Sequence, residues 1–107
     1  MLKKGVTEEF PFDNNTLVFK VMGKMFTLTD IEDFEGINVK VLPEDGVALR
    51  DQYTFVQPAY HMNKKHWITV LMTNGVPDKL IKKWIDNSYD LVVSGLNKRE
   101  KVRLSSN

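Results

Sequence analysis

The ten residues Pro58–Trp67 carry the side chains best suited to chemistry in this 107-residue chain. Both histidines, His61 and His66, lie here, together with the adjacent Lys64 and Lys65. Lysines bind phosphates, amides bind phosphates or base edges, and exposed aromatic rings stack on bases. The combination favours a basic, aromatic binding loop over a catalytic site.

The same stretch also has a purely structural interpretation. Tyr60 and Trp67 would then be core residues, and His61 or His66 would be hydrogen-bonded groups behind the surface. The lysine pair would mark the tip of a hairpin. The residue types alone leave both interpretations open.

Catalytic constellations are missing from the sequence. The absence of cysteine excludes disulfides, thiolate zinc sites and cysteine nucleophiles. A catalytic zinc needs about three protein ligands, and the two histidines have no HExxH partner. There is no phosphate-cradling glycine motif and no nucleophile elbow. The segment 30–36 has four carboxylates without the EF-hand spacing, which favours a solvated loop. We therefore expect a non-enzymatic protein with no cofactor or metal.

Composition indicates one globular domain, with 42% hydrophobic and 27% charged residues. The net charge is only +1, but residues 1–53 sum to −4 and residues 54–107 to +5. Such asymmetry can mark a face that binds a polyanion, unless folding intermixes the two halves. No apolar run reaches the roughly 20 residues that span a bilayer, and no secretory leader is visible. We expect a soluble, cytoplasmic protein without a membrane partner.

Periodicity and turn residues predict an α+β chain. The expected elements are an edge strand ended by Pro11, a hairpin of 17–21 and 24–28 around Met22-Gly23, a strand at 37–41, a helix from Pro43, a strand at 67–72 and a helix over 77–94. In the second hairpin arm, strict alternation places Met25 and Thr27 on one face, and Phe26 and Leu28 on the other.

The two helices have predicted inner faces. In the helix from Pro43, Val47 and Ala48 would point inward, with Leu49 and Tyr53 as further candidates. In the helix over 77–94, Trp84 lies within an apolar stripe and is more typical of a core residue than of a base-stacking platform. The tail from residue 97 has four basic residues and one acidic residue. It would either extend the long helix or trail as a basic arm.

Six segments resemble a known family: Phe10-Pro11-Phe12, Val18-Phe19-Lys20-Val21, Gly23-Lys24-Met25-Phe26, the block Pro58–Trp67, Ser88-Tyr89-Asp90-Leu91-Val92, and Gly95-Leu96 with Lys98. Together they are similar to the MmcQ/YjbR family, over residues 6–99. The resemblance implies a two-layer α+β domain, 1–107, with an antiparallel sheet and helices on one face, as in CyaY-like and secretion-chaperone-like folds. Family members usually begin with a full helix, which is truncated here, so a homodimer is a further expectation.

The resemblance implies a DNA-binding function, by analogy of fold. Together with the basic stretch, it predicts these contacts: Lys64, Lys65, His66, Asn63, His61, Lys20, Lys24, Lys98 and Arg99. Asn63 and His61 would orient the others. The alternative is a protein-interaction or small-ligand module with a cleft at Tyr60 and Trp67.

Overall fold

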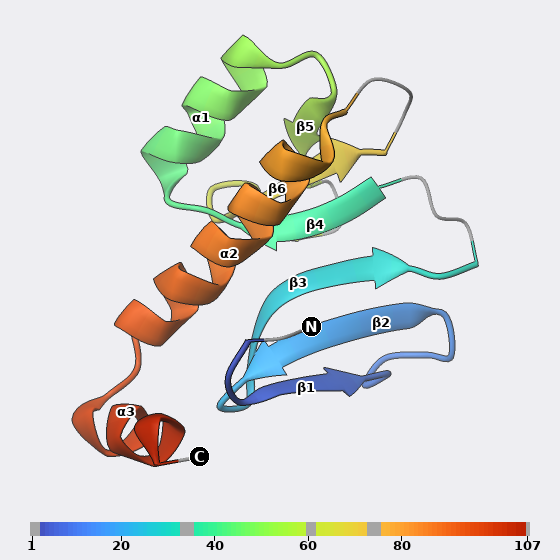
Figure 1. Ribbon diagram of the computed structural model, residues 1–107. Helices are drawn as coiled ribbons and strands as arrows, with labels where there is room; N and C mark the ends of the chain where they lie inside the picture. Colours follow the sequence, from blue (N-terminus) through green and yellow to red (C-terminus); the bar gives the residue numbers. More distant parts are fainter. Residues whose placement is uncertain (1–2, 33–35, 60–61, 73–75, 107) are drawn as a thin grey trace.

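The computed structural model describes residues 3–32, 36–59, 62–72 and 76–106 (Figure 1). This part of the chain forms an open antiparallel sheet with helices packed on one face, which confirms the predicted α+β class. Its elements are β1 (Val6–Glu9), β2 (Thr16–Val21), β3 (Lys24–Asp30), β4 (Gly36–Lys40), α1 (Pro43–Gln52), β5 (Val56–Pro58), β6 (Trp67–Leu71), α2 (Asp78–Ser94) and α3 (Lys98–Ser105).

The strand order is β1-β2-β3-β4-β6-β5, so consecutive strands pair except where α1 intervenes. β1 is an edge strand as predicted, and it ends at Glu9, before Pro11. β5 forms the other edge and was not predicted. Its three residues are too few to show a period of two, and proline at its end is tolerated because an edge strand needs fewer donors.

The predicted hairpin of β2 and β3 is confirmed. Met22 and Gly23 have φ values of 50° and 77°, so both central residues of the turn are left-handed. This conformation suits the twist of a two-residue hairpin, and glycine adopts it without steric cost.

The predicted alternation in β3 is wrong, because the hairpin contains a bulge. Phe19 pairs with Thr27 and Lys20 pairs with Met25, which leaves Phe26 as an extra residue in β3. Phe26 therefore turns to the helix side, where its ring meets Tyr89 edge-on at 5.5 Å. Thr27 stays on that side as well, while Met25 joins Lys20 on the opposite face.

Helix α2 covers the sheet with the face predicted from its periodicity. Ile81, Trp84, Ser88 and Val92 are buried, which confirms Trp84 as a core residue. Trp84 packs on Val39, Ile68 and Val70, while its ring lies 5.3 Å from that of Tyr53 at the end of α1. Tyr89 of the same helix is buried as well.

Helix α1 forms at Pro43 as predicted, and Leu49 and Tyr53 pack on the core as expected, but the prediction for the other two residues is wrong. Val47 and Ala48 are exposed, and the buried residue is Gly46. A Cβ atom at Gly46 would lie 3.1 Å from Val41 and 3.5 Å from Ile68. The absence of a side chain is therefore what lets α1 lie close against the sheet.

The C-terminal tail is neither an extension of α2 nor a trailing arm. The chain leaves α2 at Gly95 and starts the separate helix α3 with a capping box, in which Asn97 accepts from the Glu100 amide and Glu100 accepts from the Asn97 amide. Leu104 of α3 is buried against the core formed by Val21, Phe26 and Tyr89.

The first described residues are fastened to α2 and α3. Lys3 pairs with Asp86 at 3.0 Å and lies over the Tyr89 ring, 4.9 Å from its centroid. The Tyr89 hydroxyl donates to the Lys4 carbonyl, and the Lys4 ammonium donates to the Ser105 carbonyl. These contacts join β1 to the helix layer.

We predict that Thr27→Val leaves the free energy of unfolding unchanged or raises it by up to about 1 kcal/mol. The buried Thr27 hydroxyl has no hydrogen-bond partner within the described ranges, so its desolvation is uncompensated. Thr29→Val is the matched control and should cost about 1 kcal/mol, because the Thr29 hydroxyl donates to the Gly36 carbonyl at 2.8 Å. Urea unfolding measures both; equal losses would show that Thr27 is hydrogen-bonded.

We predict that alkaline pH destabilises the wild-type protein more than Tyr89→Phe. Burial raises the pKa of Tyr89 above its ordinary value of 10.0, with Asp90 adding to the rise and Lys3 opposing it. Tyr89 ionises at a lower pH in the unfolded chain than in the folded protein. Its contribution to the free energy of unfolding is therefore complete below about pH 10 and is lost as pH rises through the folded-state pKa. Urea midpoints at about pH 8 and pH 11 measure the difference. Parallel losses in the two proteins would contradict it.

Candidate nucleic-acid interface

The sheet face opposite the helices carries the candidate site. All three helices of the described chain pack on the other face (Figure 1). Alternation along the strands sends Lys20, Met25, Lys40, Trp67 and Thr69 to this helix-free face. Two hollows lie on it, side by side.

The first hollow, which we call the lysine hollow, measures about 460 Å³. Lys20 of β2, Lys24 of β3 and Lys40 of β4 line it, with the buried Trp67 of β6 among them. Neighbouring strands lie about 4.8 Å apart, so the hollow extends across four adjacent strands, β2, β3, β4 and β6, over roughly 14 Å. The remaining lining residues are Pro11, Phe12, Gly23 and Met25.

Two of these lysines have carboxylate neighbours. Lys20 lies 3.5 Å from Glu9 of β1, and Lys24 lies 3.7 Å from Glu100 of α3. Lys24 and Glu9 are substantially exposed. Exposed ion pairs are worth about 0–1 kcal/mol, so an incoming anion can displace them.

The backbone that carries Lys40 is held from two sides. Its carbonyl oxygen lies 2.6 Å from the buried hydroxyl of Ser88 in α2. The following amide, of Val41, donates to the His66 carbonyl at 2.8 Å. The end of β4 is therefore fixed to both the helix layer and the 62–66 loop.

The loop before β6 presents the predicted basic residues to solvent. Lys64, Lys65 and His66 are all exposed. The Asn63 side chain accepts from the Lys65 amide at 2.9 Å, and the Asn63 carbonyl accepts from the His66 amide at 3.1 Å. Asn63 thus shapes the turn, in keeping with an orienting role. Arg50 of α1 donates to the Lys64 carbonyl at 3.4 Å.

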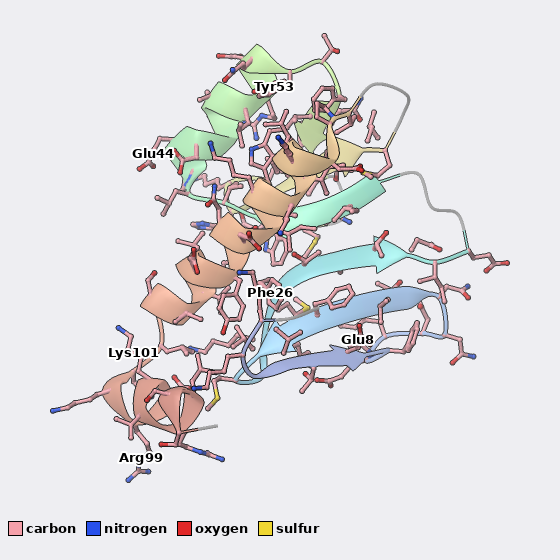
Figure 2. The ribbon with its side chains drawn as sticks, viewed as in Figure 1. Glu8, Phe26, Glu44, Tyr53, Arg99 and Lys101 are labelled. Atoms are coloured by element: carbon pink, nitrogen blue, oxygen red, sulfur yellow. The ribbon has the colours of Figure 1, made fainter. Side chains whose placement is uncertain are left out.

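The other predicted residues are placed differently. His61 and Tyr60 lie outside the described residues. Lys98 and Arg99 are exposed on the first turn of α3 and do not line the lysine hollow; Figure 2 shows Arg99 projecting away from the sheet. Their helix meets the hairpin on the helix side, through the packing of Leu104 on Val21 and Phe26 and through the Lys24–Glu100 pair.

The second hollow, which we call the polar groove, measures about 820 Å³ and adjoins the first through Phe12 and Met25. Asn38, Gln57 and Thr69 line it, and the Thr69 hydroxyl donates to the Asn38 side-chain oxygen at 2.6 Å. The sheet face is therefore lined by lysines at one end and by neutral hydrogen-bonding groups farther along.

Acidic residues line the far end of the polar groove, where Asp13 and Asp30 lie. The backbone amides of Asn15 and Thr16 donate to the Asp13 carboxylate and lower its pKa, so it stays charged at neutral pH. Asp30 pairs with Thr16, four residues from Lys20 in β2, so Asp30 and Lys20 lie roughly 13 Å apart along the helix-free face. Charge thus changes sign along this face.

Sequence reasoning missed Lys40 and Phe12. The alternation Ile37-Asn38-Val39-Lys40 contained the signal for Lys40, since it places Asn38 and Lys40 opposite two apolar residues. What the sequence could not supply was that the polar side of this strand meets Lys20 and Lys24 from the hairpin. Phe12 had no periodic signal, because it lies in the loop after β1.

The part of the chain that the structure describes has neither a metal-binding cluster nor a membrane-spanning helix. No group of three or more acidic or histidine side chains is placed to hold a metal ion. No described helix is long and apolar enough to cross a bilayer.

The chain belongs to the YjbR family, because the family model described as YjbR matches residues 1–91. It is 38% identical over 96 residues to the uncharacterized protein YbdF of Escherichia coli O157:H7, covering 89% of this chain and 79% of that one. It is 30% identical over 105 residues to the uncharacterized protein YjbR of Escherichia coli K12, covering 97% and 89%. These findings confirm the predicted family.

Two proteins with crystal structures have a fold similar to that of this chain. Protein DR2400 of Deinococcus radiodurans, described as a DUF419 domain, superposes with a TM-score of 0.87 at 41% identity, covering 97% of this chain and 80% of that one. A protein from Pseudomonas syringae gives 0.67 at 32% identity, covering 80% and 86%. None of these names states a ligand, so the function has to be argued from the site.

Proposed function

We propose that this protein binds nucleic acid, with DNA as the first candidate, and that it does not catalyse a reaction. The observation that carries the proposal is the lysine hollow, which is lined by lysines from three adjacent strands. The Lys24 ammonium pairs with Glu100 of α3, so Lys20 and Lys40 supply the charges on the helix-free face. The exposed Lys64, Lys65 and His66 lie in the loop just before β6, the strand next to β4.

The clustered lysines are unfavourable in the protein alone and become favourable when a phosphate is bound. Lysines on adjacent strands repel one another, and they gain when a shared anion enters between them. Phosphate neutralisation supplies most of the affinity in sequence-independent binding. The weak pairs with Glu9 and Glu100 keep the lysines compensated until phosphate replaces the carboxylates.

A small-ligand module is the alternative, and the size of the polar groove favours it. A groove of about 820 Å³ falls within the usual range of ligand sites. The salt dependence of the affinity distinguishes the two functions, because phosphate binding weakens steeply as the salt concentration rises and binding in an uncharged groove does not.

We predict that Lys40→Ala with Lys65→Ala lowers affinity for a labelled DNA oligonucleotide about ten-fold at low salt. Each lost phosphate contact should also reduce the slope of log affinity against log salt by about 1. Fluorescence anisotropy measures both quantities. The matched control is Lys79→Ala with Lys82→Ala, which removes the same charge from the exposed side of α2.

The control variant should bind within about two-fold of the wild-type protein. Equal losses in the two double variants would mean that net charge alone drives binding, and the proposed site would be wrong. No DNA binding by the wild-type protein at low salt would end the nucleic-acid proposal and leave the small-ligand function.

We also predict that Glu9→Gln raises DNA affinity about two- to three-fold. Glu9 lies 3.5 Å from Lys20, so removing its charge leaves the lysine uncompensated on the helix-free face. Glu8→Gln is the matched control, since Glu8 pairs with Phe19, which packs against the helix-side core, and so points to the helix side of β1. The same anisotropy titration measures both, and an equal rise in the two variants would contradict a local effect.

A further inference from the structure

Phosphate binding by the lysine hollow does not account for the polar groove beside it. The two hollows share Phe12 and Met25, so a ligand seated in one meets the other directly. The groove has side-chain amides and hydroxyls on its walls and apolar groups from Met25, Leu28 and Leu71. This is the chemistry of a site for a flat ring with hydrogen-bonding edges.

We propose that the helix-free face binds single-stranded nucleic acid, with a base stacked on Phe12, neighbouring bases in the polar groove and the phosphates at the lysine hollow. This inference rests on the proposed function and specifies its ligand. It assigns Phe12, Asn38 and Gln57 to base recognition, and Lys20 and Lys40 to the backbone.

Phe12 is the feature that points most directly to bases. Its side chain is 65% exposed, the largest exposure among the large hydrophobic residues of the described chain. It stands where the two hollows join, between the lysines and the amides. An exposed aromatic ring beside cationic side chains is the usual platform for stacking unpaired bases.

The polar groups of the groove can meet base edges. The Asn38 side-chain oxygen accepts from Thr69, which leaves the amide protons of Asn38 directed to other acceptors. Gln57, on β5, faces the same side of the sheet as Thr69, its partner in the strand register. Amides of this kind pair with the edges of bases through a donor and an acceptor together.

Charge fixes which part of the ligand lies where. Asp30, at the far end of the groove, repels phosphate, while Lys20 attracts it roughly 13 Å away along β2. The backbone is therefore confined to the lysine end and the bases to the groove.

The shape of the site disfavours a duplex. Duplex DNA is read by a helix or ribbon that protrudes into a groove of the DNA, whereas the lysines here surround a depression. Paired bases cannot leave their stack to enter the polar groove without the cost of unpairing. Unpaired bases enter it without that cost.

The test compares a labelled ten-nucleotide thymidine-rich single strand with its own duplex, by fluorescence anisotropy at near-physiological salt. We expect the single strand to bind at least about five-fold more tightly than the duplex. Phe12→Ala should weaken single-strand binding about ten-fold and change duplex binding less than two-fold. Phe12→Tyr, which keeps a stacking ring, should stay within two-fold of the wild-type protein.

Phe10→Ala is the matched control, since Phe10 is 47% exposed and lines neither hollow. Equal losses in Phe10→Ala and Phe12→Ala, or a duplex bound as tightly as the single strand, would overturn this inference. If the duplex is bound through Lys40 and Lys65 without a single-strand preference, the proposed function stands and only this inference fails. If neither form binds, both fail.

Discussion

The bulge in the β2–β3 hairpin is the constraint on which the two faces of the sheet depend. One extra residue at Phe26 lets both Phe26 and Thr27 reach the helix side, where Phe26 meets Tyr89. The same shift turns Met25 to the helix-free face, next to Lys20. Without it, a phenylalanine would lie among the lysines and a methionine in the core. Core and candidate site are thus set by one irregularity in backbone pairing.

The two faces of the sheet have different roles, one in the core and one in the candidate site. On the candidate-site face, positive and negative charges lie at opposite ends of the strands. The helix side holds the aromatic and aliphatic core, in which Trp84 and Tyr89 anchor α2. The helix-free side holds Lys20 where β2 ends, and carboxylates before β2 begins and where β3 ends. Antiparallel pairing produces this gradient, because residues from the end of one strand and the start of the next come to lie together. Figure 1 shows these strand ends next to the turn of the hairpin.

Sequence patterns predicted most elements because their signals are local. The hairpin turn, the proline that opens α1 and the stripe of α2 each depend on residues within a few positions of one another. The errors arose where distant contacts decide. Gly46 is buried because Val41 and Ile68 meet it, and Leu104 draws the tail into a helix against Phe26. For the site, Lys20, Lys24 and the 62–66 loop were visible as basic residues, but their assembly with Lys40 required the strand order.

The fastening of the first residues to the two C-terminal helices has a consequence for local unfolding. Lys4 and Ser105 are 101 residues apart in sequence, and Tyr89 and Lys4 are 85 apart. Gly5, with a φ of 73°, fits against Leu104 where any Cβ atom would collide with it. Loss of the first segment therefore exposes Leu104 and Tyr89 together, so β1 and α3 open as one cooperative unit. Amides at both ends of the chain should then exchange with solvent at a common rate, although only one of the two segments is helical.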